Sequence, residues 1–275
     1  MTFSGVFVPL VTPFDADGAV DLAALTGLAR GVLADGAAGL VALGTTGEPA
    51  GLSDGEREAV VEVVAGVCRE HGAPLVVGAG PAAGADALLS VVPPFVRPGE
   101  AGVIAHFTAL AAASPIPLIV YHVPYRTGQS LSIGALRELA ALDGVAGVKL
   151  AVGGIDTATI ELMADPPPGF AVLGGEDAVI SPLLALGAAG GILASAHVAT
   201  GEFAGLVSAW RDGDVGRARA LGHRLAGLSI ALFAEPNPAV IKGVLHAQGR
   251  IATPAVRLPL LPAAPASVRA ATGLL

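Results

Sequence analysis

Lysine, cysteine and aromatic residues are all scarce in this sequence of 275 residues. Its single cysteine, Cys68, excludes a disulfide within the chain and is typical of a protein from a reducing cytoplasm. We expect its thiol to be packed in the interior. Aromatic residues make up only 4% of the chain, so small and aliphatic residues must fill the core. Two of its fifteen basic residues are lysines, Lys149 and Lys242, and the other thirteen are arginines.

Charged residues are also few, at 14% of the chain, and the net charge is -8. This charge, without a cluster of lysines or arginines, argues against binding to nucleic acid or to anionic membranes. No basic segment followed by an apolar one occurs at the N-terminus, so we expect no signal peptide. The six histidines have no HxxxH or HxH spacing, and residues 78–80 lack the full dinucleotide fingerprint. We therefore expect neither a metal site nor a bound cofactor.

Two uncharged stretches, residues 101–125 and 180–201, are long enough to span a membrane. The first is interrupted by the sequence SPIP, and the second by Pro182 and a pair of glycines. We interpret each as a helix beside a buried strand.

Short apolar runs recur along the chain with helical stretches between them. The expected strands are residues 5–10, 39–43, 75–79, 87–92, 117–122, 145–149, 170–173 and 190–194. Continuous apolar runs are typical of parallel strands that are buried on both faces. Eight such strands alternating with helices predict an α/β protein with a (β/α)8 TIM barrel, and an open doubly wound sheet is the alternative.

Several of the expected helices begin at residues with good capping side chains: Ser53, with Glu56 three positions later, and Asp21, Ser132 and Asp156. The expected helices are residues 21–35, 53–71, 99–113, 132–142, 156–163 and 177–186, followed by a helical tail at 214–232, 238–248 and 264–275. The chain is thus expected to divide into a barrel, residues 1–212, and a C-terminal helical region, residues 213–275.

The third barrel helix is absent from this pattern. Only the seven residues 80–86 connect the third and fourth expected strands. A parallel crossover normally takes a dozen or more residues, although seven extended residues reach about 23 Å and could return the chain. Such a strap would leave the outer faces of both strands uncovered. Either another element or a partner covers them, or the sequence omits a segment.

Lys149 lies within the apolar run VAGVKLAV, residues 145–152. Removal of its amine from water disfavours the charged form, lowers the pKa and leaves a nucleophile that can form a Schiff base with a carbonyl. The alternative is a lysine that extends from a strand end into water. We expect Lys242, on a helix of the tail, to be a solvated surface residue.

Other polar residues follow neighbouring strands of the expected barrel, where barrel active sites lie. Residues 44–48, GTTGE, offer hydroxyls and backbone amides in a tight turn that suits a carboxylate. Tyr121 offers a phenol that can relay protons, or a packing side chain at the rim. Arg126 can hold a carboxylate with two hydrogen bonds. With Lys149, these residues describe a site for a 2-oxo acid.

These motifs resemble the dihydrodipicolinate synthase/N-acetylneuraminate lyase family. The resemblance runs through nearly the whole chain and rests on PLVTPF at 9–14, GTTGE at 44–48, YxVPxRTG at 121–128, GVK at 147–149, GGED at 174–177 and EPNP at 235–238. It implies a (β/α)8 barrel with C-terminal helices, usually a homotetramer, and class I aldolase chemistry with pyruvate bound to lysine. The implied partners are pyruvate and an aldehyde.

The resemblance also implies roles for individual residues. Lys149 matches the Schiff-base lysine, Tyr121 the phenol beside it, and Thr45 and Thr46 the turn that binds the pyruvate carboxylate. Thr46 also matches the hydroxyl of the proton relay. The substrate-binding arginine of the synthase branch corresponds to Arg126. Two further positions, Gly175 and Leu193, match residues that line the pocket.

The sequence departs from the family where PPFVRP, residues 93–98, replaces a segment that usually carries two tyrosines. The second tyrosine normally reaches a neighbouring subunit's site and moves protons, whereas Phe95 keeps the ring without the hydroxyl. By this resemblance, Phe95 is still expected to be a substrate-binding residue. His122, Tyr125 and His197 replace smaller or amide residues. We expect a synthase that condenses pyruvate with aspartate semialdehyde. The alternatives are a 2-oxo-3-deoxy sugar acid aldolase and a non-catalytic barrel that binds a 2-oxo acid.

Overall fold

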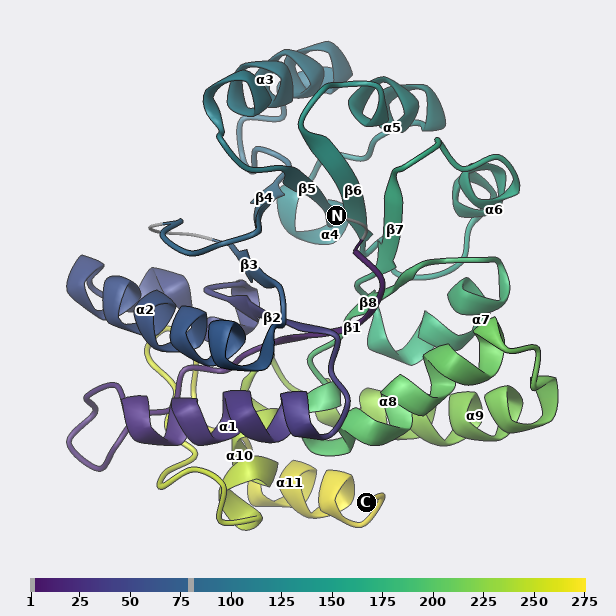
Figure 1. Ribbon diagram of the computed structural model, residues 1–275. Helices are drawn as coiled ribbons and strands as arrows, with labels where there is room; N and C mark the ends of the chain where they lie inside the picture. The colour runs from purple at the N-terminus through teal and green to yellow at the C-terminus, as the bar shows by residue number, and fades with distance from the viewer. Residues whose placement is uncertain (1–2, 79–81) are drawn as a thin grey trace.

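A closed barrel of eight parallel strands forms the centre of the computed structural model, which describes residues 3–78 and 82–275 (Figure 1). The strands are β1 Gly5–Pro9, β2 Gly39–Ala42, β3 Leu75–Val77, β4 Ala87–Val91, β5 Leu118–His122, β6 Val145–Leu150, β7 Ala171–Gly174 and β8 Gly190–Ile192. Each pairs with the next, and β8 pairs with β1. The predicted TIM barrel is confirmed with all eight strands, and the open sheet is wrong.

Helices surround this barrel in a ring (Figure 1). They are α1 Leu22–Ala34, α2 Asp54–His71, α3 Gly99–Ala113, α5 Ile133–Ala140, α6 Thr157–Ala164, α7 Ile180–Ala185 and α8 Ala196–Arg211, with one short turn of helix, α4 Pro124–Thr127. Three 3₁₀ turns are η1 Thr45–Gly47, η2 Pro49–Gly51 and η3 Asp177–Val179. The tail forms α9 Val215–Leu232, α10 Ala239–Ala247 and α11 Pro265–Thr272.

Capping side chains explain where α1, α2, α5, α6 and α9 begin. At α2, the Ser53 backbone N–H donates to Glu56 Oε2 at 2.8 Å, and the Glu56 N–H donates to Ser53 Oγ at 3.3 Å. Asp21, Ser132 and Asp156 likewise accept backbone hydrogen bonds at the starts of α1, α5 and α6. These predicted starts are confirmed. The sequence analysis missed α8 and α4, and the helix expected from residue 177 begins with the 3₁₀ turn η3.

Both uncharged stretches combine helix and strand, as expected: α3 precedes β5 in the first, and α7 precedes β8 in the second. Within the described ranges, no helix has the length and hydropathy needed to cross a membrane. The Cys68 thiol is buried, as predicted, and burial raises its pKa to about 12.

The connection from β3 to β4 has no helix at residue 78 or at residues 82–86, and the rest of the predicted strap lies outside the described residues. Asp86 closes the connection: its N–H donates to the Leu75 carbonyl oxygen and its Oδ2 accepts from the Leu75 N–H, both at 2.8 Å. Leu75 and Val77 are fully buried in the hydrophobic cluster to which α2 contributes Val64. Of the alternatives left open, a neighbouring element is therefore the one that covers β3, whereas Leu88 of β4 is half-buried.

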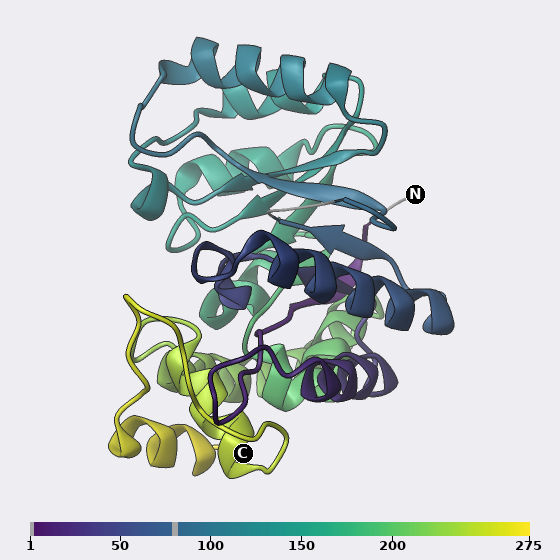
Figure 2. The same cartoon turned by 90° about the vertical axis from the view of Figure 1, so that its left-hand side faces the viewer.

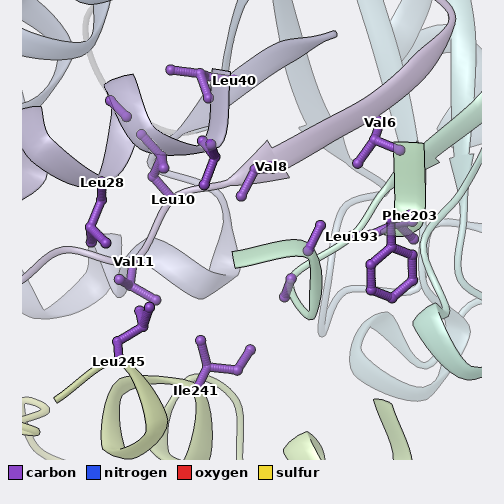
Figure 3. Packing of buried hydrophobic residues seen from close by; sticks show 14 of the residues in the cluster. Val6, Val8, Leu10, Val11, Leu28, Leu40, Leu193, Phe203, Ile241 and Leu245 are labelled. Carbon is purple, nitrogen blue, oxygen red and sulfur yellow. The ribbon is translucent and has the colours of Figure 1, made fainter. Parts of the chain in front are cut away.

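The C-terminal helices share a hydrophobic core with the barrel. Ile241 and Leu245 of α10 belong to the same buried cluster as Val11, which follows β1 (Figure 3). Figure 2 shows these helices gathered at one side of the molecule. The division of the chain at residue 212 stays a prediction, and the common core means that α10 can hold residues at the ends of the barrel strands.

Candidate active site

A cleft of about 450 Å³ opens where the carboxyl ends of the strands meet the C-terminal region. Thr45, Tyr121 and Arg126, all predicted as site residues, line it together. Its lining also includes Glu48, Asn237 and Leu258. The sequence analysis gave none of these three a role in the site. A cleft of this volume with few polar groups suits a small organic substrate.

Lys149 lies beside Tyr121 because β5 and β6 pair in a register that places the two residues opposite each other. The Lys149 Nζ is 4.4 Å from the centre of the Tyr121 ring, and both residues are 8% exposed. Burial lowers the pKa of the Lys149 amine from 10.5 to about 8, while the negative charge of Asp177 acts in the opposite direction. With this pKa, roughly a tenth of the amine is uncharged at pH 7, far more than for a lysine in water, and the uncharged form is the Schiff-base nucleophile.

Two adjacent acids, Glu176 and Asp177, face this lysine from the end of β7. Asp177 is 4% exposed, and its Oδ2 accepts a hydrogen bond from the Ser195 N–H at 2.6 Å. Burial raises the pKa of Asp177 to about 6 and also raises the pKa of half-buried Glu176. The sequence analysis gave neither acid a role. Their position after β7, the neighbour of β6, could have indicated that they approach Lys149.

Gly175, which directly precedes the two acids, lets the backbone lie close to the Lys149 side chain. A Cβ atom at this position would lie 2.8 Å from the Lys149 Cε atom and 3.0 Å from its Cγ atom. The structure thus places Gly175 against Lys149. Leu193, the other residue predicted to line the pocket, is fully buried in the core cluster with Phe203 of α8 (Figure 3).

The predicted carboxylate-binding turn forms the 3₁₀ turn Thr45–Gly47. Thr45 is exposed to the cleft, whereas Thr46 is buried and its Oγ1 accepts a hydrogen bond from Asn237 Nδ2 at 2.9 Å. Burial raises the pKa of the Tyr121 phenol, and the charge of Arg126 and the Thr45 side chain act in the opposite direction. The turn, the phenol and the arginine therefore lie around one site.

Arg126 lies on the short helix α4 with its side chain against Tyr125. Its Nε donates to the Tyr125 Oη at 2.8 Å, and its Cζ lies 4.9 Å from the centre of that ring. By contrast, the Phe95 side chain is 91% exposed, and its backbone has a φ of 67°. The structure of one chain thus leaves Phe95, a predicted substrate-binding residue, outside the cleft.

Lys242 is completely buried, so the prediction of a solvated surface lysine is wrong. Its Nζ donates to the Glu48 Oε1 at 2.9 Å and to the Thr12 carbonyl oxygen at 2.8 Å. The error arises because both faces of α10 are covered: every residue from Ala239 to Leu245 is buried.

The two histidines that depart from the family are also buried. His197 accepts a hydrogen bond from the Val11 N–H at its Nε2 and lies 2.8 Å from the Ala194 carbonyl oxygen at its Nδ1, so it joins α8 to the segment after β1. Burial lowers the pKa of His122 and His197 to about 4. Across the described residues, no three side chains of histidine, cysteine, aspartate or glutamate converge as a possible metal site.

A family profile described as the dihydrodipicolinate synthetase family matches residues 2–271. The 4-hydroxy-tetrahydrodipicolinate synthase 2 of Clostridium acetobutylicum is 37% identical over 95% of this chain and 96% of its own length. A synthase of the same name from Neisseria meningitidis serogroup B is 38% identical over 94% of this chain and 92% of its own.

Solved structures agree with these relatives. Dihydrodipicolinate synthase from Thermotoga maritima superposes with a TM-score of 0.94 at 30% identity over the whole of both chains. The chloride-inhibited dihydrodipicolinate synthase from Acinetobacter baumannii, a complex with pyruvate, gives a TM-score of 0.92 at 32% identity over 99% of this chain and 98% of that one. This chain therefore belongs to the dihydrodipicolinate synthetase family.

Proposed function

We propose that this chain is a class I lyase, a 4-hydroxy-tetrahydrodipicolinate synthase that condenses pyruvate with aspartate semialdehyde through a Schiff base on Lys149. The observation that carries the proposal is the buried Lys149 amine, which has a pKa of about 8 and lies 4.4 Å from the centre of the Tyr121 ring. An amine that readily loses its proton lies beside Tyr121, which lines a cleft together with an arginine and a hydroxyl-bearing turn, and this combination is suited to a 2-oxo acid.

The first steps would proceed at the ketone of pyruvate. The Lys149 nitrogen attacks the ketone carbon and gives up its two protons, and the ketone oxygen takes up two protons and leaves as water, which gives the Schiff base. Loss of a proton from the methyl group then forms an enamine. The enamine carbon attacks the aldehyde carbon, whose oxygen takes up a proton. These proton transfers need a group with donor and acceptor capacity beside the nitrogen, which the Tyr121 phenol offers.

The remaining residues would bind and stabilise. Thr45 and Thr46 would bind the pyruvate carboxylate through their hydroxyl and backbone N–H groups. Glu176 and Asp177 lie near enough to Lys149 to raise the pKa of its amine, and they would stabilise the positive charge of the protonated Schiff base. Exposed Arg126 would hold the carboxylate of the incoming aldehyde.

Aspartate semialdehyde is the proposed acceptor because the relatives named above are synthases of this kind. Their names favour it over a 2-oxo-3-deoxy sugar acid, and Arg126 provides a partner for an acceptor carboxylate. We also propose a cytoplasmic homo-oligomer, a dimer or tetramer, because Phe95 and Val96 are 91% and 74% exposed beside the barrel rim and would be covered by a second copy.

Trapping with pyruvate and borohydride tests the proposal. Reduction should add one pyruvyl group to the intact protein, and peptide mapping should place it on Lys149. The assignment is simple because the chain has only one other lysine. Lys149→Arg should abolish trapping, because a guanidinium remains protonated. In a separate assay without borohydride, the wild type supplied with pyruvate should consume aspartate semialdehyde faster than other aldehydes in a panel. The absence of any adduct on Lys149 would refute the Schiff-base mechanism.

A further inference from the structure

The second lysine of the chain, Lys242, has a buried charge that the chemistry proposed above does not use. Its side chain is fully buried, and its Nζ lies 4.1 Å from the centre of the Phe14 ring. The ammonium donates to two oxygens, Glu48 Oε1 and the Thr12 carbonyl oxygen, at 2.9 and 2.8 Å. A buried ammonium is costly unless it is paired and hydrogen-bonded, so this arrangement holds Lys242 and both partners in fixed positions.

Glu48, the partner of Lys242, directly follows the turn Thr45–Gly47. Its side chain is 3% exposed, and its backbone lies in the left-handed region, with φ of 55°, which disfavours residues other than glycine. While Oε1 accepts from Lys242, Oε2 accepts from the Arg257 N–H at 2.8 Å. One carboxylate therefore joins the turn, α10 and the segment that begins at Arg257, of which Leu258 lines the cleft.

A second hydrogen bond joins the same region to the turn. Asn237, two residues before α10, donates from Nδ2 to the Thr46 Oγ1 at 2.9 Å. Between these two contacts, the Gly47 carbonyl oxygen accepts from the Thr12 Oγ1 at 2.7 Å. Three consecutive residues, Thr46 to Glu48, are thus each held by a polar contact from a distant part of the chain.

We propose that Lys242 is a positioning residue that fixes the carboxylate-binding turn through its ion pair with Glu48, so that Thr45 and Thr46 are preorganised for pyruvate. This inference rests on the proposed function, because it assumes that the turn binds the pyruvate carboxylate. Lys242 itself lies behind the turn and does not touch the substrate. Its effect would appear in the affinity for pyruvate and not in the reactivity of Lys149.

The central test is Lys242→Met, which keeps an unbranched side chain one atom shorter and removes its charge. The concentration of pyruvate that gives half of the maximal borohydride trapping rate should rise at least about tenfold, since small displacements of binding groups have large effects. The trapping rate at saturating pyruvate should stay within about twofold of the wild-type rate. This variant also leaves Lys149 as the only lysine, so an adduct can be assigned directly.

Ile241→Ala is the matched control, because it truncates a fully buried side chain at the neighbouring position of α10 that has no polar group to bond Glu48. Its half-saturating pyruvate concentration should match the wild type, even if its melting temperature falls. An equal rise in both variants would mean that general packing of α10 matters, and would overturn the proposal. An unchanged half-saturating concentration in Lys242→Met would also overturn it.

Two further variants keep the test decisive if Lys242→Met does not fold. Glu48→Gln removes one charge of the pair, and Asn237→Ala removes the contact to Thr46. Both variants should raise the half-saturating pyruvate concentration relative to the wild type, which should itself be trapped normally. The double variant K242M/E48M should recover thermal stability relative to K242M without recovering pyruvate affinity. Recovery of both thermal stability and pyruvate affinity would show that the ion pair between Lys242 and Glu48 is purely structural, and would overturn the proposal. Failure of the wild type to be trapped would instead refute the proposed function.

Discussion

The carboxylate of Asp177 lowers the cost of a charge on Lys149, although the two residues lie on different strand ends. Burial lowers the pKa of the Lys149 amine to about 8, and Asp177 is the largest influence in the opposite direction. In turn, the positive charge of Lys149 limits the rise in the pKa of Asp177. The reactivity of the lysine therefore depends on a neighbouring acid as well as on its own burial.

The pH dependence of pyruvate trapping should report this balance. At low pyruvate concentration, the trapping rate should rise with pH as the amine loses its proton, with a midpoint near pH 8. Asp177→Asn removes a negative charge that favours protonated Lys149, so the midpoint should shift to lower pH. The asparagine Oδ1 can still accept from the Ser195 N–H. Trapping rates by intact mass across pH 6–10.5 measure both midpoints.

A midpoint near 10.5 in the wild type would mean that the amine is solvated in solution. A shift to higher pH in Asp177→Asn would mean that Asp177 is not a charged neighbour of Lys149. Ser195→Ala is a suitable control, since it changes a buried neighbour of Asp177 but retains the backbone N–H that Asp177 binds.

Gly175→Ala should impair Lys149 without removing any functional group. The new Cβ would lie 2.8 Å from the Lys149 Cε, a distance that forces the lysine to move. Since displacement by about 1 Å can cost about a hundredfold in rate, we expect trapping at saturating pyruvate to slow by roughly ten- to a hundredfold. Gly227→Ala is the control, because a Cβ at Gly227 would meet no atom within 4 Å. Gly153→Ala is less suitable, because Gly153 has a positive φ. Gly227→Ala should therefore trap normally.

Arg126 should matter for the aldehyde and not for pyruvate. Arg126→Ala should leave trapping nearly unchanged, because the side chain is exposed and hydrogen-bonded to Tyr125. The KM for aspartate semialdehyde should rise by about tenfold or more, as expected for loss of a charge-assisted hydrogen bond. Steady-state kinetics and trapping on the same preparation check both parts. Equal damage to both would assign Arg126 a structural role.

The sequence predicted the barrel because buried parallel strands leave continuous apolar runs, and it predicted Lys149 because a lysine within such a run is conspicuous. It did not predict the surroundings of Lys242. The contact between Lys242 and Glu48 joins residues 194 positions apart, and Asn237 and Thr46 are separated by 191. A local pattern on one helix cannot show that a distant turn covers its polar side.

The missed helix α8 has a related cause. It begins within an uncharged stretch, so no alternation of polar and apolar residues marks its first turns, and Ala199 interrupts its regular backbone with a φ of -144°. Its start also has no side-chain cap. The sequence therefore contained neither of the two signals that identified α1, α2 and α5.

Glu56 should stabilise the fold in a pH-dependent way. Its pKa is lowered from 4.5 to about 2, mainly by hydrogen bonds from Arg257, whose guanidinium also donates to the Gly51 and Gly18 carbonyl oxygens. A lowered carboxyl pKa contributes stability above pH 4.5, and this contribution disappears as the pH falls from 4.5 to 2. Glu56→Gln should lower the free energy of unfolding by roughly 1–2 kcal/mol at pH 7, after allowance for solvent screening.

The difference between Glu56→Gln and the wild type should vanish near pH 2, as measured by denaturant unfolding across this range. Glutamine can still accept the capping hydrogen bond from the Ser53 N–H, so the comparison isolates the pair with Arg257. Glu70→Gln provides the control, because the ion pair of Glu70 with Arg30 is exposed on both sides and should contribute little at any pH. A constant difference at all pH values would show that the charge of Glu56 is not responsible.

Tyr125 should carry the proton in this chain, in place of the family's tyrosine at the position of Phe95. The family resemblance implies a phenol at position 95, and a benzyl side chain can neither donate nor accept a proton. In this chain, the Tyr125 hydroxyl accepts a hydrogen bond at 2.8 Å from Arg126, which lines the cleft. Burial raises the pKa of the Tyr125 phenol, and the charge of Arg126 acts in the opposite direction. If Tyr125 supplies the missing hydroxyl, Tyr125→Phe should lower kcat with aspartate semialdehyde at least about tenfold.

Phe95→Tyr separates the two explanations. If the chain lacks a proton carrier, this variant should raise kcat at least about tenfold, a conservative part of the range for general acid–base catalysis. If Tyr125 carries the proton, Phe95→Tyr should be neutral or harmful, and F95Y/Y125F should recover the activity that Y125F loses. Pyruvate trapping should be unchanged in all three variants, because Lys149 and the turn at Thr45 are untouched. Because Phe95 is 91% exposed in one chain, its effect should also require the assembled oligomer, which dilution below the dissociation constant of the oligomer would test. No change in kcat for either single variant, with any aldehyde, would show that neither ring takes part in proton transfer.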